Sequence, residues 1–189
     1  MLYAKIPNKE KHWQPHLETY FNSYLRRCIK GSAADMGESA NNYRAFLSFA
    51  TPSTRPTGHR DVNFANVCWD TPCGIVLAHQ YLINDKKEYR GLACVGFTIE
   101  KSIIHIRQIQ GARYRQEELL PLRWEKLLVK VVIEIARQLG FKTVEILPAE
   151  KNEWRDLISY SQLKLRYDVT AKRMGFKWNP QKRVYEFAL

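Results

Sequence analysis

The stretch RWEKLLVKVVIEIARQLGFKTVEI, residues 123–146, decides the fold of this chain. Its apolar residues recur at three- and four-residue intervals, which predicts an amphipathic helix over Pro121–Leu139. Proline suits the first turn of a helix, and Gly140 suits the position just after the last turn. Phe141–Leu147 then alternates apolar and polar residues, as a strand does. The helix residues expected in the core are Trp124, Leu128, Val131 and Ile135.

The segment before this helix is predicted to hold two helices and a run of strands. The helices are expected over Pro15–Ile29 and Asn42–Phe49. Short connections rich in turn residues separate the strands, which indicates antiparallel neighbours. The four strands are expected at Val62–Trp69, Gly74–Ile83, Gly91–Ile99 and Ser102–Ile109.

The segment after Leu147 is predicted to be helical and then to close as a hairpin. A short helix is expected at Asn152–Ser159 and a longer one at Gln162–Met174, with the hairpin formed by Phe176–Trp178 and Arg183–Phe187. The chain is therefore expected to form one domain of the α/β or α+β class. Its mixed central sheet should be mostly antiparallel, with one parallel strand-helix-strand unit joining Ser102–Ile109 to Phe141–Leu147.

Within that single domain over residues 1–189, we expect a helical part at 1–60, antiparallel strands at 61–110, and a helix-strand-helix-hairpin part at 111–189. The N-terminal residues have no apolar run typical of a signal peptide, and no stretch is apolar enough to span a membrane. The cytoplasm is the expected compartment. Four cysteines without a CxxC pair predict reduced thiols and no metal site.

The order of elements resembles the GNAT superfamily of N-acyltransferases over Gly91–Leu189. The resemblance rests on the stretch at 123–146 and on LRYDVTAKRMGFK, residues 165–177, a helix that ends in Gly-Phe before a last strand pair. It implies a GNAT-like fold and an acyl-CoA-dependent N-acyltransferase, with acetyl-CoA or another acyl-CoA as the donor. An amine would attack the thioester carbonyl directly, while backbone donors polarise that carbonyl.

The same resemblance implies a cofactor loop that begins at Gln108 and Gly111. The family's motif, Gln/Arg-x-x-Gly-x-Gly/Ala, cradles the pyrophosphate on backbone N–H groups. Here Arg113 stands where the last small residue belongs, and further residues precede the helix, so we expect CoA to bind weakly or not at all. Arg113 and Arg115, with Arg107 and Arg123, favour phosphate binding; a solvated basic loop is the alternative.

Two residues are candidates for the chemistry. The family's acidic tyrosine corresponds in position to Ala171, and Tyr167 lies one turn earlier, where it serves a shifted site or simply packs in the core. His105, on the strand Ser102–Ile109, is a candidate general base, although a lone histidine on a strand is more often structural. His79 is a weaker candidate of the same kind.

The net charge of +11 favours a polyanionic partner such as RNA, tRNA or DNA. A stripe on the outward face of the long helix is the candidate nucleic-acid surface, and an ordinary solvated face is the alternative. A non-catalytic GNAT-fold protein that binds nucleic acid or a protein partner therefore stays open beside the enzyme. The stripe consists of Arg123, Lys126, Lys130 and Arg137.

Overall fold

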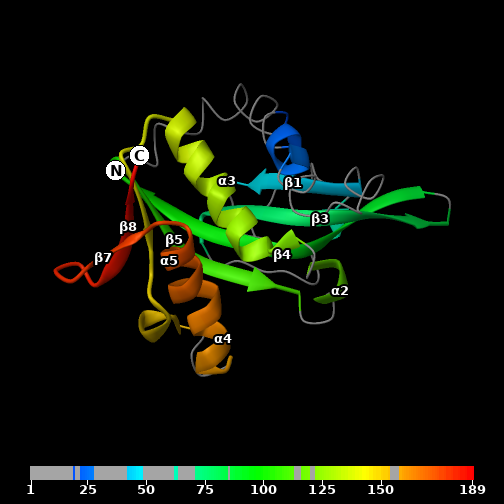
Figure 1. Cartoon of the computed structure of the whole chain (residues 1–189). Helices are drawn as coiled ribbons and strands as arrows, with labels where there is room; N and C mark the ends of the chain where they lie inside the picture. Colours follow the sequence, from blue (N-terminus) through cyan, green and yellow to red (C-terminus); the bar gives the residue numbers. More distant parts are fainter. Residues whose placement is uncertain are drawn as a thin grey trace.

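In the computed structural model, one mixed sheet runs through the chain in the order β1-β3-β4-β5-β6-β8-β7, and β2 pairs with β4 beside this path. The structure describes residues 19, 22–27, 42–48, 62–63, 71–84, 86–112, 116–119, 122–153 and 158–189. Figure 1 shows α3 lying across one face of the sheet, and the hairpin of β3 and β4 reaching out to one side.

Residues 43–48 are a strand, so the helix expected over Asn42–Phe49 is wrong. This strand, β1 (Tyr43–Ser48), pairs antiparallel with β3, from Tyr43↔His79 to Ser48↔Gly74. Its buried residues alternate along the chain, since Tyr43, Ala45 and Leu47 are buried while Arg44 is exposed. Cross-strand pairing to a long neighbour outweighs the weak helical spacing of so short a segment.

The antiparallel run is confirmed in β3 (Cys73–Ile83), β4 (Lys86–Glu100) and β5 (Ile103–Gly111), each of which pairs with the next. The strand expected over Val62–Trp69 is described only as β2 (Val62–Asn63). It pairs with β4 in parallel, whereas an antiparallel neighbour was expected.

The predicted parallel unit is confirmed. The helix α3 (Trp124–Gln138) joins β5 to β6 (Thr143–Ile146), and these two strands pair in parallel from Ile103↔Thr143 to Ile106↔Ile146. The four expected core residues of the helix are all buried: Trp124, Leu128, Val131 and Ile135 are 8%, 1%, 1% and 3% exposed.

The C-terminal elements follow the predicted order. They are the 3₁₀ turn η5 (Ala149–Lys151), α4 (Tyr160–Lys164), the π-helical turn η7 (Leu165–Val169), α5 (Thr170–Arg173), β7 (Lys177–Asn179) and β8 (Val184–Ala188). The last strand, β8, inserts between β6 and β7, and pairs antiparallel with both. The antiparallel run, long helix, parallel strand, further helix and terminal hairpin together make a GNAT-like fold.

Some expectations fall largely or wholly outside the described residues. Of the helix expected over Pro15–Ile29, the structure describes residue 19 and residues 22–27, all helical. Half of the helix expected at Asn152–Ser159 lies outside, as do both Arg113 and Arg115, and the described residues of that helix are not α-helical. Cys73 and Cys94 are buried and form no disulfide within the described residues, as expected. Among the described helices, none has the length and apolar character to cross a bilayer.

Candidate functional site

The strands β5 and β6 part in the middle of the sheet. Their register ends at Ile106↔Ile146, and β5 continues to Gly111 beyond the end of β6. A bulge at the same place assists the parting, because Ile106 pairs with Phe97 whereas Gln108 pairs with Gly96, which leaves one extra residue in β5. The backbone N–H groups that β5 turns toward β6 beyond Ile106 therefore need partners other than a strand.

The Tyr167 side chain supplies one such partner. The N–H of Ile109 donates a hydrogen bond of 2.9 Å to the Tyr167 hydroxyl oxygen. The tyrosine is 1% exposed and lies in η7, where a π-helical turn widens the helix. Burial raises the pKa of Tyr167 above its usual value of 10.0, so the hydroxyl keeps its proton at neutral pH.

Two further buried side chains, Asn152 and Asp168, help to position Tyr167 where β5 and β6 part. The Asn152 side chain interacts with Tyr167, and this interaction opposes part of the rise in the tyrosine pKa that burial causes. The Asp168 carboxylate accepts the Ala149 N–H at 3.1 Å and so ties η7 to the chain that leaves β6. Asn152 and Asp168 are 2% and 8% exposed, so these polar contacts are made inside the protein. The segment that follows β6 and the π-helical turn η7 thus position the Tyr167 hydroxyl together.

Gly111 is packed against protein on the side of the sheet that α3 covers. A Cβ atom at this position would lie 2.9 Å from Trp124 Cζ2 and 3.2 Å from Leu119 Cδ1. Leu119 belongs to the short helix α2 (Gln116–Leu119), and the guanidinium of Arg166 stands 5.8 Å from the centre of the Trp124 ring. The glycine at 111 therefore permits close packing of the Trp124 and Leu119 side chains.

Gln108 and Gly111 are both within β5, and they face opposite sides of the sheet. The Gln108 side chain is 3% exposed and donates to Gln110 Oε1 at 2.8 Å, close to Gly96. The strand expected to end at Ile109 continues through Gly111, which pairs with Ala93, so both residues lie in β5. Antiparallel pairing with the long strand β4 keeps this segment extended.

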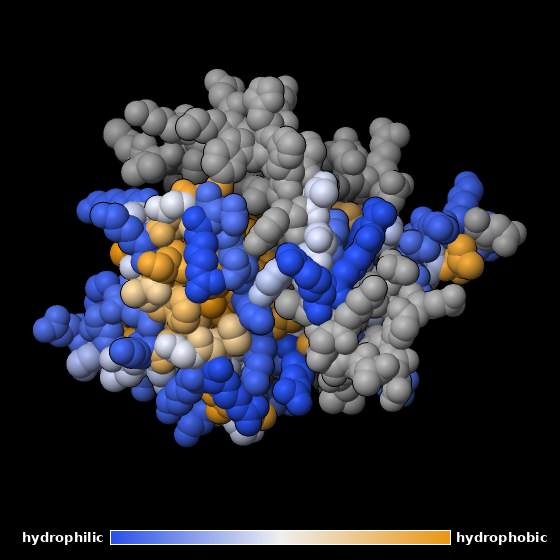
Figure 2. Space-filling view, turned by 45° about the horizontal axis from the view of Figure 1, so that its top comes forward, coloured by the Kyte–Doolittle hydropathy of each residue, from blue (hydrophilic) through white to orange (hydrophobic). Residues whose placement is uncertain are grey.

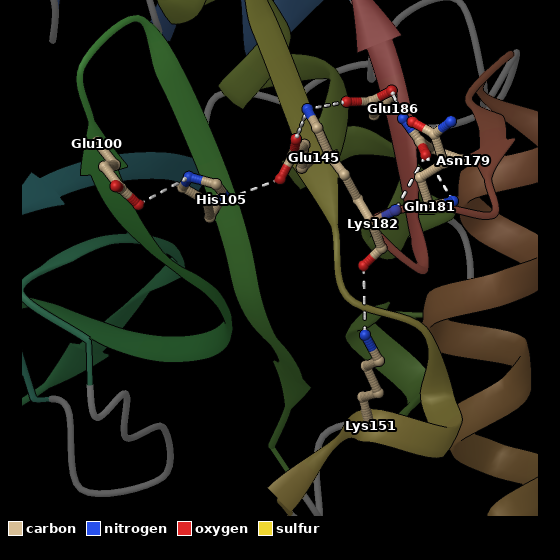
Figure 3. Close-up of polar contacts among 8 residues, drawn as sticks. All are labelled: Glu100, His105, Glu145, Lys151, Asn179, Gln181, Lys182 and Glu186. Atoms are coloured by element: carbon tan, nitrogen blue, oxygen red, sulfur yellow. Dashed lines mark hydrogen bonds and ion pairs between the residues drawn. The ribbon is translucent and has the colours of Figure 1, made fainter.

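His105 lies in a separate polar cluster that spans the four strands β4, β5, β6 and β8 (Figure 3). Its Nδ1 atom is 2.8 Å from Glu145 Oε2, and its Nε2 atom is 3.7 Å from Glu100 Oε2. Glu145 Oε1 accepts from Lys182 Nζ at 2.9 Å, and Lys182 also contacts Glu186. Glu145 is the acidic partner that inspection of the sequence did not identify.

The cross-strand register explains the cluster. His105 pairs with Glu145 across β5 and β6, and Glu145 pairs with Glu186 across β6 and β8. Asn179 Nδ2 donates to Glu186 Oε2 at 2.6 Å, and this bond and Lys182 lower the pKa of Glu186. Hydrogen bonds to Glu186 and Glu145 raise the pKa of Lys182, and Glu186 has the larger effect. The structure therefore places His105 and Tyr167 in two separate sites. Tyr167 interacts with Ile109 and Asn152, and His105 interacts with Glu145.

The basic stripe of α3 is partly neutralised by its neighbours. Arg137 forms an ion pair with Glu134, and its guanidinium lies 5.7 Å from the centre of the Phe187 ring. Lys130 Nζ lies 5.8 Å from the centre of the Tyr24 ring, whereas Arg123 is exposed. On the face drawn in Figure 2, an apolar area separates groups of hydrophilic residues.

Ile109, Asn152 and Glu145 were missed as site residues. Glu145 carried one usable signal, because it is a charged residue between buried Val144 and Ile146 on a predicted strand. Ile109 contributes only a backbone N–H, for which the residue type gives no sign.

No family model matches this chain, and no curated protein matches it. Among solved structures, it is similar to a protein from Desulfovibrio desulfuricans assigned to the GNAT family of acetyltransferases. The two share 13% identity with a TM-score of 0.35, over 88% of this chain and 91% of the other. The chain is also similar to a protein from Chromobacterium violaceum described as a probable acetyltransferase of the GNAT family. These two share 13% identity with a TM-score of 0.36, over 89% of this chain and 80% of the other. Likenesses at these TM-scores decide nothing about activity, and the GNAT-like character of the fold rests on the order and pairing of its own elements.

Proposed function

We propose that this chain is an acyl-CoA-dependent N-acyltransferase that works where β5 parts from β6. The single observation that carries the proposal is the meeting of the Ile109 N–H and the Tyr167 hydroxyl at 2.9 Å in that gap. The first group is a fixed donor suited to a developing oxyanion. The second is a protonated acid suited to a leaving thiolate.

The residues present suit one end of acyl-CoA better than the other. The acyl end fits, because the gap offers a backbone donor and a protonated hydroxyl. On the side-chain face of Gly111 the space is occupied by Trp124 and Leu119, so the phosphate end gains no room on that face. When bound, acyl-CoA would supply an acyl group activated as a thioester.

The roles of the chain's own groups follow from their positions. Tyr167 must first release the Ile109 N–H, which then donates to the carbonyl oxygen of the acyl group. The attacking amine would form a bond to the carbonyl carbon, the carbon–sulfur bond would break, and the Tyr167 hydroxyl would give its proton to the departing sulfur. The proton that the amine nitrogen loses as the amide forms would then return to the Tyr167 oxygen and restore the hydroxyl. Because one protein hydrogen bond is lost when the site opens, the proposal is compatible with weak CoA binding.

The test is thiol release from acetyl-CoA by the full chain, with free amino acids, peptides and polyamines supplied as amines. Thiol release above the uncatalysed rate is expected with at least one amine class. Tyr167→Phe should lower kcat, while Tyr185→Phe, a buried tyrosine on β8, should leave it unchanged. The absence of thiol release with every amine class, together with no binding of acetyl-CoA at millimolar concentration, would exclude the proposal.

A non-catalytic GNAT-like protein is the second candidate, and a specific observation favours it. Tyr167 satisfies the donor in the gap, and Trp124 fills the space above Gly111, so this part of the interior is packed without a ligand. On this alternative, acetyl-CoA leaves the melting temperature unchanged and Tyr167→Phe affects stability alone.

A further inference from the structure

The C-terminal helix and the edge strand carry a concentration of positive charge. Between Tyr160 and Asn179 there are five cationic residues and a single acid. The acid, Asp168, is 8% exposed and already accepts the Ala149 N–H, so it faces inward. The cations are Lys164, Arg166, Lys172, Arg173 and Lys177.

Four of these cations are exposed and unneutralised. The Arg166 guanidinium lies 5.8 Å from the centre of the Trp124 ring. The other four, Lys164, Lys172, Arg173 and Lys177, are exposed and form no ion pair within the described part of the chain. Their neighbours in sequence behave differently, because Lys182 contacts Glu145 and Glu186, and Arg183 contacts Glu150 at 2.9 Å. The acid that pairs in register with Lys177 is Glu186, which Lys182 and Asn179 already engage.

An exposed aromatic side chain follows these cations in the sequence. Trp178 follows Lys177 on β7 and is 44% exposed, although an indole usually seeks burial. The Tyr185 ring supports it at 5.1 Å between ring centres, so the indole is held in place. β7 is the last strand in the sheet order, and Lys177 and Trp178, which as consecutive strand residues point to opposite faces of it, are both exposed. The short turn after α5 brings Lys172 and Arg173 close in sequence to this strand.

We propose that these residues form a binding surface for single-stranded nucleic acid. The C-terminal basic surface consists of Lys164, Lys172, Arg173, Lys177 and Trp178. Its cations would neutralise backbone phosphates, while a base stacks on the indole. A single strand is favoured over a duplex because only unpaired bases expose a ring face to the indole. Tyr167 points inward from the same helix at 1% exposure, so the surface is independent of the proposed reaction.

The experiment measures fluorescence anisotropy of a labelled oligouridylate against the full chain over a series of salt concentrations. Lys172→Glu with Arg173→Glu is compared with Lys126→Glu and Lys130→Glu on α3, because both pairs change the total charge equally. The first pair should weaken binding about tenfold or more, and should reduce the salt slope by about 1.4, at about 0.7 for each lost phosphate contact. The α3 pair should have a clearly smaller effect on both quantities.

Trp178→Ala separates stacking from charge. It should weaken binding about tenfold and leave the salt slope unchanged, because it removes a base contact but no phosphate contact. Melting curves of all variants establish that they are folded, which their exposed positions favour.

Three outcomes would overturn the inference. The first is a failure of the wild type to bind oligouridylate even at about 50 mM salt, a condition that strengthens phosphate contacts. The two charge-reversal pairs could weaken binding equally, which would make total charge the cause. Binding to anionic lipid vesicles without binding to oligouridylate would assign the surface to a membrane.

Discussion

The N–H of Ile109 on β5 donates its hydrogen bond to the hydroxyl of Tyr167, and not to the neighbouring strand β6. The two residues lie 58 positions apart in the sequence. This hydrogen bond satisfies a backbone donor of β5 at the point where β5 and β6 separate. It also brings together the two groups that the proposed acyl transfer would use, so its removal bears on both stability and activity.

Replacing Tyr167 by phenylalanine should destabilise the protein by about 1–3 kcal/mol, because the buried Ile109 N–H loses its partner. Urea denaturation measures the change in the free energy of unfolding. Tyr185→Phe is the matched control, since no hydrogen bond of its hydroxyl occurs among the residues that the structure describes. Equal effects of the two substitutions would show that the bond to Ile109 contributes little.

Gly111→Ala should destabilise the chain by about 1–3 kcal/mol through crowding, because the added Cβ would stand 2.9 Å from Trp124 Cζ2. In a Trp124→Phe background the same substitution should cost less, since the crowding indole atoms are gone. A double-mutant cycle of unfolding free energies measures this coupling. An additive cycle would mean that Gly111 is required for a reason other than the tryptophan.

Glu145→Ala should cost about 1–3 kcal/mol, because His105 Nδ1 loses a buried partner at 2.8 Å. Glu100→Ala removes the other carboxylate beside the same imidazole, but Glu100 is 72% exposed and 3.7 Å away. Its removal should change stability by less than about 0.5 kcal/mol. Chemical denaturation at pH 7 compares the pair, and a larger loss for Glu100→Ala would contradict the arrangement in Figure 3.

Stability should fall as the pH drops through the acid range. The hydrogen bond from Asn179 and the contact with Lys182 lower the pKa of Glu186 from its usual value of 4.5. A carboxylate with a lowered pKa in the folded state stabilises the fold above its unfolded pKa, and this contribution is lost as the pH falls through the folded pKa. Urea midpoints measured from pH 6 downward report the loss. Asn179→Ala should make the dependence shallower, and an unchanged profile would remove Glu186 as its source.

Leu128→Ala should destabilise the protein by about 2–5 kcal/mol, because Leu128 is 1% exposed within the core. Gln138→Ala, on the exposed last turn of α3, tests the same helix without creating a cavity and should leave stability nearly unchanged. Thermal melting compares the two variants. Similar melting temperatures for both would contradict the burial of Leu128.

The long helix, its flanking strands and the parallel pairing were predictable because they depend on local periodicity. Residues 123–146 repeat apolar side chains with the helical period and then with the strand period, and the short connections restrict how the strands can pair. The same criterion failed at residues 43–48, which are too short for their spacing to distinguish the two periods. There, pairing with β3 decided the outcome.

The candidate site was less predictable because it depends on distant contacts. His105 and Tyr167 were visible as residue types, but their partners Glu145 and Ile109 lie 40 and 58 positions away. Glu145 is set beside His105 by strand register, and the Ile109 N–H is available to Tyr167 because β6 ends before β5 does.

The sequence by itself determined the long helix, the strand after it and the excess of positive charge, because each is a property of neighbouring residues or of composition. Only the tertiary structure decided which cations are neutralised and which hydroxyl enters the gap between β5 and β6. The physical reason is that a hydrogen bond or ion pair acts over a few ångströms, and the fold alone brings residues so far apart in the chain within that range.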